Sequence, residues 1–222
     1  MGDLEDQHKI FLQAFMWKKI CDNKEVRDLF RKCHDIVNVE ISDLPVFVMK
    51  INSFLKPLNM AILKGVDELT EESYYILINS NNNNLSRLAP EYKVQELEVF
   101  KSITSSIVKS DDGRISSTDA LNLEIETKIS KKEVNDMLQM FQKDGWLCEK
   151  EGYYFFSTRA IAELQHFFRE NYADFISICH LCKNIVFQGP SCKSCDQKLH
   201  NHCKKTYFSR SQVCCPNCNG NF

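Results

Sequence analysis

The stretch from Cys179 to Cys218 reads CHLCKNIVFQGPSCKSCDQKLHNHCKKTYFSRSQVCCPNC and contains eight of the 11 cysteines of the 222-residue chain. It holds four ligand pairs with two residues between the members of each: Cys179 and Cys182, Cys192 and Cys195, His200 and Cys203, and Cys215 and Cys218. This spacing lets both members of a pair reach one ion, and structural Zn²⁺ takes four such sulfur or imidazole donors. The four pairs therefore predict two zinc ions.

Two other uses of clustered cysteines fit the sequence poorly. A redox Cys-x-x-Cys pair needs a thioredoxin-like context, which is absent here. A disulfide framework needs an oxidising compartment, but the acidic start Met1–Asp6 lacks the layout of a secretory signal. No apolar run approaches the ~20 residues of a membrane span. We therefore expect a reducing, intracellular compartment and no contact with a membrane.

The order of the ligands, four cysteines, one histidine and three cysteines, resembles the cross-braced fingers of the RING and PHD kinds. That resemblance implies that the first and third pairs share one ion and that the second and fourth pairs share the other. One set is then Cys179, Cys182, His200 and Cys203, and the other is Cys192, Cys195, Cys215 and Cys218. Three nearby residues, His180, His202 and Cys214, are treated as spare, and Cys214 competes most closely with its neighbour Cys215.

The residues that flank the ligands separate the two kinds of finger. A PHD finger usually has a bulky aromatic residue two positions before its last ligand pair, where this chain has Val213. RING fingers that engage ubiquitin-conjugating enzymes tend to carry an aliphatic residue before the second ligand and a proline inside the last pair. Leu181 and Pro216 match both positions and are candidate contacts with that enzyme. Many active RING fingers also have a basic residue after the last ligand, where this chain has Asn219.

Upstream of the cysteines, the hydrophobic periodicity predicts a winged helix in the first third of the chain. Helices are expected over 6–19 and 24–36, followed by a third that opens at Ser42-Asp43 with Pro45 in its first turn. Strands are expected at 60–66 and 74–79. The first helix is expected to carry Trp17 on its apolar face, and the third to bury Phe47, Ile51, Phe54, Leu55 and Leu58. The polar run 79–84 indicates a linker.

The same order of elements is predicted a second time. Helices are expected over 92–108 and 118–123, and a third begins at a capping box of Ser130 and Glu133 and ends at Gly145. Strands at 146–149 and 153–156 and a helix over 158–172 follow. The predicted fold is thus mainly α with small β-hairpins (α+β), with tandem winged-helix domains followed by a cross-braced two-zinc RING-like finger. The predicted domains are 1–84, which includes the linker, 85–175 and 176–222.

The charges of the chain favour protein–protein contact over direct binding of nucleic acid. The 28 Lys and Arg nearly balance the 30 Asp and Glu, which gives a net charge of −2. Residues 90–175 hold 11 basic and 16 acidic residues, whereas phosphate contacts need a local positive excess. Residues 176–222 hold six basic and one acidic residue, but seven zinc-bound thiolates would lower that excess to about +2.

Taken in order, the three parts resemble a known family, the non-SMC element one subunit of the Smc five–six chromosome-maintenance complex. The motifs that carry the resemblance are Gly145-Trp146-Leu147, Glu149-Lys150-Glu151-Gly152, Arg159-Ala160-Ile161, Gln188-Gly189 and the ligand pairs, with Asn52 and Lys64-Gly65-Val66 in the first winged helix. The resemblance implies a RING-type E3 ubiquitin ligase subunit. Such a finger has no catalytic residues and acts by positioning a ubiquitin-loaded conjugating enzyme.

The resemblance also implies partners and a cellular place. The winged helices would dock a MAGE-family subunit, a kleisin subunit would join them, and DNA would be met mainly through the complex. The expected process is DNA repair by homologous recombination, on chromosomes in the nucleus. The alternative is a non-catalytic scaffold whose finger only completes an interface, which Asn219 favours. A PHD-like reader of chromatin is the third possibility.

Overall fold

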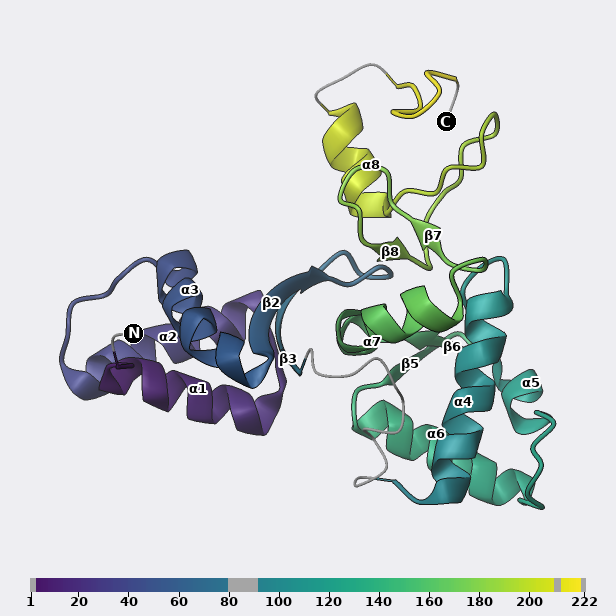
Figure 1. The fold of residues 1–222 in the computed structure, drawn as a ribbon, viewed down its shortest axis with the longest axis horizontal. Helices are drawn as coiled ribbons and strands as arrows, with labels where there is room; N and C mark the ends of the chain where they lie inside the picture. The colour runs from purple at the N-terminus through teal and green to yellow at the C-terminus, as the bar shows by residue number, and fades with distance from the viewer. Residues whose placement is uncertain (1–2, 80–91, 210–212, 221–222) are drawn as a thin grey trace. The chain divides into compact units, whose positions relative to one another are not determined.

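The structure is a computed structural model that describes residues 3–79, 92–209 and 213–220 (Figure 1). Nearly all of the linker predicted at 79–84 lies outside the described residues. Of the described residues, 3–67 and 72–79 form one compact unit, and 68–71 form a second together with everything from 92 onward. The predicted fold class is confirmed. Within the described ranges, no helix has both the length and the apolar character needed to cross a membrane.

The first unit is a winged helix. Its elements are α1 (Asp6–Lys18), β1 (Ile20–Asp22), α2 (Asn23–Val37), α3 (Leu44–Leu55), the 3-10 helix η1 (Lys56–Leu58), β2 (Met60–Val66) and β3 (Ser73–Asn79). The strands form one antiparallel sheet in the order β1-β3-β2. Asp43 caps α3 ahead of Pro45, as predicted. Strand β1 was not predicted, because three residues are too few to show an alternating pattern.

Aromatic rings fill the core of this unit, and Phe47 lies at their centre. Its ring centroid is 5.2 Å from that of Phe11 and 5.0 Å from that of Phe30. The predicted burial of Phe54, Leu58 and Trp17 is wrong, because these side chains are 48%, 56% and 84% exposed. Successive helical residues point about 100° apart, so Phe54 and Trp17 lie on other faces than their buried neighbours. Helix α3 ends at Leu55, and the tighter η1 turns Leu58 away from the core.

Asn52 joins α3 to the edge strand β2. Its side-chain amide donates to the carbonyl of Ile62 at 2.9 Å, and its oxygen accepts from the N–H of Ile62 at 2.7 Å. Replacing Asn52 with Ala leaves both backbone groups without this partner, so we expect Asn52→Ala to lower the free energy of unfolding by about 2–3 kcal/mol. Urea denaturation would measure the loss. Ser53→Ala, which removes an exposed bond to Met49 on the same helix, is the control. Equal stability of the two variants would contradict this role.

The second unit contains a second winged helix and the finger. Its elements are α4 (Val94–Lys109), β4 (Ile115–Ser116), α5 (Ser117–Leu121), α6 (Lys131–Lys143), β5 (Leu147–Lys150), β6 (Tyr153–Phe156), α7 (Thr158–Asn171), β7 (Ser177–Ile178), β8 (Ile185–Val186) and α8 (Asn201–Phe208). The capping box of Ser130 and Glu133 begins α6, and Gly145 follows the helix with a φ of +74°. Both features agree with the prediction.

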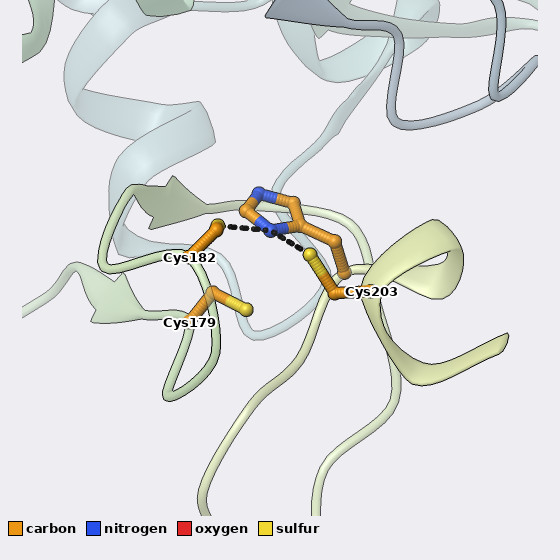
Figure 2. Close-up of side chains that lie close together, drawn as sticks. Cys179, Cys182 and Cys203 are labelled. Carbon is orange, nitrogen blue, oxygen red and sulfur yellow. Dashed lines mark hydrogen bonds between the residues drawn. The ribbon is translucent and has the colours of Figure 1, made fainter. Parts of the chain in front are cut away.

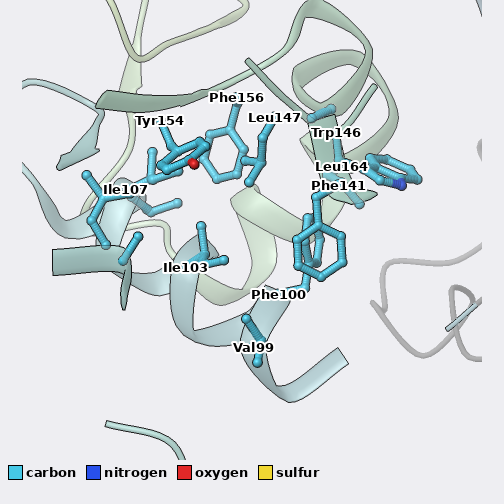
Figure 3. Close-up of a cluster of buried hydrophobic side chains, with 14 of the residues drawn as sticks. Val99, Phe100, Ile103, Ile107, Phe141, Trp146, Leu147, Tyr154, Phe156 and Leu164 are labelled. Atoms are coloured by element: carbon cyan, nitrogen blue, oxygen red, sulfur yellow. The ribbon is translucent and has the colours of Figure 1, made fainter. Parts of the chain in front are cut away.

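Trp146 is buried in the core of the second winged helix (Figure 3). Its indole N–H donates to the hydroxyl of Tyr92 at 3.0 Å, and this hydroxyl donates to Asp144 at 2.6 Å. The guanidinium of Arg159 lies 4.2 Å from the Trp146 ring centroid and forms a buried ion pair with Glu163 at 2.9 Å. The indole, the Tyr92 hydroxyl and the Arg159 guanidinium are thus each paired around Trp146, as burial of polar groups requires.

This core continues into the finger through Ile185 and Phe187. Both side chains are buried in the same cluster as α4, α6 and α7. The ring centroid of Phe187 is 5.0 Å from that of Phe156 and 5.2 Å from that of Phe168. The start of the finger is thus fixed by ordinary hydrophobic packing.

Candidate metal centre

Three of the four ligand pairs lie on turns with the same backbone. In each, the carbonyl of the first cysteine accepts a hydrogen bond from the residue after the second cysteine: Lys183 N to Cys179 O at 2.9 Å, Asp196 N to Cys192 O at 3.0 Å and Asn219 N to Cys215 O at 2.9 Å. The three donor residues have φ values of +63°, +55° and +56°. Asparagine enters this left-handed region more readily than most residues. Asn219 thus has a local structural role in its turn.

The fourth pair lies at the start of a helix. His200 is the N-cap of α8, and Cys203 lies in its first turn. The Nδ1 atom of His200 is 3.3 Å from the Cys182 sulfur and 3.8 Å from the Cys203 sulfur. Figure 2 shows the side chains of Cys179, Cys182 and Cys203 converging on one space. The imidazole therefore presents Nδ1 to the sulfurs.

The eight predicted residues come together in two groups of four. Cys179, Cys182, His200 and Cys203 form the first cluster, and Cys192, Cys195, Cys215 and Cys218 form the second. Within each cluster the donor atoms all lie within 4.8 Å of one another. The clusters interleave along the chain, because the first and third pairs meet and the second and fourth pairs meet. This is the cross-braced arrangement of a RING finger.

The distances between donor atoms fit a tetrahedral ion. Four sulfurs bound at about 2.3 Å lie about 3.8 Å from one another, and a sulfur and an imidazole nitrogen lie about 3.6 Å apart. In the second cluster the Cys192–Cys218 and Cys195–Cys215 sulfur pairs are both separated by 3.7 Å. In the first, the two sulfur–Nδ1 distances of 3.3 and 3.8 Å bracket the expected value. The donor set, seven sulfurs and one imidazole, suits zinc.

Hydrogen bonds within the two clusters shift the pKa values of several candidate ligands. A hydrogen bond from Cys182 lowers the pKa of the Cys179 thiol well below its usual value, and the same bond raises the pKa of Cys182. The Asn217 amide donates to the Cys195 sulfur at 3.5 Å and is the main cause that lowers the pKa of that thiol to about 6. Burial lowers the pKa of His200, but hydrogen bonds with Cys179 and Glu68 outweigh it and raise the pKa to about 10.

Two further cysteines, Cys21 and Cys33, are buried in the core of the first winged helix, outside the finger. Burial raises the pKa of both Cys21 and Cys33 to about 11, so their thiols stay protonated at neutral pH. Thiolates are the form that binds metals. Neither thiol belongs to the two clusters of candidate ligands.

The spare residues stay outside both clusters. Cys214, His180 and His202 are in neither set of close donor atoms, and His202 stacks on the ring of His200 with centroids 5.0 Å apart. Leu181 is half-buried against the small core of the finger, and Pro216 is half-buried. Val213 is 66% exposed. The predicted enzyme contacts Leu181 and Pro216 thus keep part of their surface accessible.

One residue close to the first cluster was not predicted from the sequence. The carboxylate of Glu68 lies 3.1 Å from Nε2 of His200, although Glu68 belongs to a polar turn more than a hundred residues earlier. No local pattern marks such a residue, because the sequence around it indicates only a turn between two strands.

The fold and the two clusters define a protein of tandem winged helices followed by a RING-like finger. Residues 8–164 match the family described as "Nse1 non-SMC component of SMC5-6 complex", and residues 179–218 match "RING-like domain". The chain therefore belongs to the Nse1 family. Its relatives named "Non-structural maintenance of chromosomes element 1 homolog" include those of Xenopus laevis, 37% identical over 97% of this chain and 82% of the relative, and Homo sapiens, 35% identical over 99% and 85%.

Two further comparisons agree. The protein of Schizosaccharomyces pombe named "Non-structural maintenance of chromosomes element 1" is 30% identical over 97% of this chain and 91% of its own length. A chain of a solved structure titled "Nse1-Nse3-Nse4 complex" is similar with a TM-score of 0.88 and 37% identity, over 99% of this chain and 97% of that one. The resemblance inferred from the motifs is confirmed at the level of the family.

Proposed function

We propose that this chain is a RING-type E3 ubiquitin ligase subunit of the Smc five–six complex, with one Zn²⁺ in each cluster. The cross-bracing of the two clusters is the observation that carries the proposal. The finger would bind a ubiquitin-conjugating enzyme through Leu181 and Pro216 and hold its ubiquitin thioester ready for a substrate lysine. Catalysis of this kind is positioning and needs no catalytic residue of the finger.

The proposal includes partners and a place in the cell. The similar solved structure is titled "Nse1-Nse3-Nse4 complex", which supports an assembly of this chain with a MAGE-family and a kleisin subunit. Four large apolar side chains of α3 and η1 are about half exposed or more: Val46, Met49, Phe54 and Leu58. Large apolar side chains left exposed on neighbouring elements are typical of a protein interface. Repair of DNA by homologous recombination, on chromosomes in the nucleus, follows from the proposed membership of that assembly.

The test is a ubiquitin-chain assay with purified conjugating enzyme, with and without the MAGE-family subunit. We expect chains to form when the partner is present, and Leu181→Ala to lower the initial rate about tenfold, which corresponds to about 1.4 kcal/mol of lost binding. Val213→Ala is the matched control, because Val213 is an exposed apolar residue of the same finger outside the proposed contact.

The second candidate function is a scaffold without ligase activity. The observation that favours it is Asn219, which occupies the position of the usual basic residue and serves its own turn. No chains under any condition would leave this function standing. Equal chain-forming rates for Leu181→Ala and Val213→Ala would instead overturn the proposed contact through Leu181.

A further inference from the structure

Glu68 is a buried carboxylate that belongs to the same compact unit as the finger. It lies in the turn between β2 and β3, and its side chain is 5% exposed. The carboxylate accepts hydrogen bonds from the backbone N–H groups of Phe187, at 3.1 Å, and Gln188, at 2.8 Å. Burying a charge is costly unless it is paired and hydrogen-bonded. Through these bonds Glu68 contacts the backbone of the finger at Phe187 and Gln188.

The third group that faces this carboxylate is the imidazole of His200. Nδ1 of His200 faces the sulfurs of the first cluster, so the ring proton belongs on Nε2. Nε2 lies 3.0 Å from the carbonyl of Ile185 and 3.1 Å from the carboxylate of Glu68. A carboxylate on the far nitrogen of a ligating histidine fixes its tautomer and makes the near nitrogen a better donor to the metal.

We propose that Glu68 is a positioning residue of the first cluster, through which the β2–β3 turn governs how long the ion of Cys179, Cys182, His200 and Cys203 is retained. Glu68 holds the imidazole with Nδ1 toward the sulfurs and increases the electron density at that atom. The second cluster consists of sulfurs alone and has no such residue among its four donors. The two ions therefore differ in their dependence on Glu68. This inference rests on the proposed occupancy of both clusters by zinc.

The turn also supplies a matched control. Glu71, three residues later, forms an ion pair with Lys205 of α8 at 2.6 Å, and the Lys205 side chain is 70% exposed. An exposed pair of this kind contributes little to stability. Glu68→Gln and Glu71→Gln therefore remove the same charge from the same turn, and only the first removes it from His200.

The experiment follows the transfer of zinc from the full chain to an excess of a coloured chelator. We expect two phases, and Glu68→Gln should accelerate one of them about 10- to 100-fold, the usual effect of losing an outer partner of a metal ligand. The other phase, and both phases of Glu71→Gln, should keep the rates of the unaltered chain. Circular dichroism checks that each variant keeps its helices.

A second pair of variants separates positioning from general packing. His200→Cys keeps a metal ligand but removes Nε2, so adding Glu68→Gln to it should no longer change the release rate. Persistence of the full acceleration in that background would overturn the proposal, as would equal rates for the unaltered chain and Glu68→Gln. An unaltered chain that holds fewer than two zinc ions would overturn the proposed metal centre and this inference with it. If the unaltered chain holds two zinc ions firmly and Glu68→Gln does not accelerate the release of either, the inference about Glu68 is overturned and the proposed metal centre stands.

Discussion

Exhaustive removal of zinc is expected to unfold the finger beyond Phe187 while the helices α1–α7 keep their circular dichroism signal. The buried residues of the finger's own core are Cys179, Val186 and Leu199, with Leu181 and Cys203 partly buried beside them. So small a core cannot offset the conformational entropy of about 30 ordered residues. A structural zinc ion contributes on the order of 10–16 kcal/mol in small fingers, so metal binding and folding of this segment are coupled.

The structure limits how far this unfolding extends. Ile185 and Phe187 are buried in the core of the second winged helix, so their amides should stay protected in hydrogen exchange after zinc is removed. Amides of α8 and of the turn at Cys215 should exchange freely. Protection of α8 that survives complete removal of the metal would contradict the coupling.

Adjacent cysteines provide the matched control for this prediction. Cys215 is buried and belongs to the second cluster, whereas its neighbour Cys214 belongs to neither. Cys215→Ser should cost the chain one of two zinc equivalents in metal analysis, and Cys214→Ser should cost none. A loss of zinc from Cys214→Ser alone would assign the ligand to Cys214 instead.

Gly189→Ala is expected to have the next largest effect, a loss of at least about 3 kcal/mol in unfolding free energy with release of zinc from the first cluster. A Cβ atom on Gly189 would overlap the carbonyl oxygen of Leu199 and would come within 3.3 Å of Val186. The obstacle is backbone, which cannot move aside as a flexible side chain can. The backbone segments that contain Gly189 and Leu199 are also joined by a hydrogen bond from Leu199 N to Pro190 O at 3.1 Å, next to His200.

Gly152→Ala is the control for this substitution. Gly152 has a φ of +81°, but a Cβ atom there would meet only the Ser117 hydroxyl, at 3.8 Å. Its cost is the strain of the left-handed conformation, about 1–2 kcal/mol. Chemical denaturation and metal analysis of both variants test the difference. If Gly189→Ala is no less stable than Gly152→Ala and keeps its zinc, the close approach of the two backbones is unimportant.

Local signals predicted much of this fold correctly because each is complete within a few residues. The spacing of Cys179 and Cys182 predicts a turn that brings two sulfurs together, and Ser130 with Glu133 predicts the start of a helix. The predictions of burial were wrong where the packing of neighbouring elements determines whether a side chain is exposed. Phe54 is apolar and lies next to a buried Leu55, and only the packing of α3 shows that it is exposed.

The sequence by itself determined the chemistry of the finger, because ligand type and spacing are properties of short segments and eight donors in that order permit few arrangements. It also determined the membership of the family. Tertiary structure alone decided that Phe187 joins the core of the second winged helix and that Glu68 meets His200. Contacts between segments far apart in the chain depend on how whole elements pack, and no local pattern encodes them.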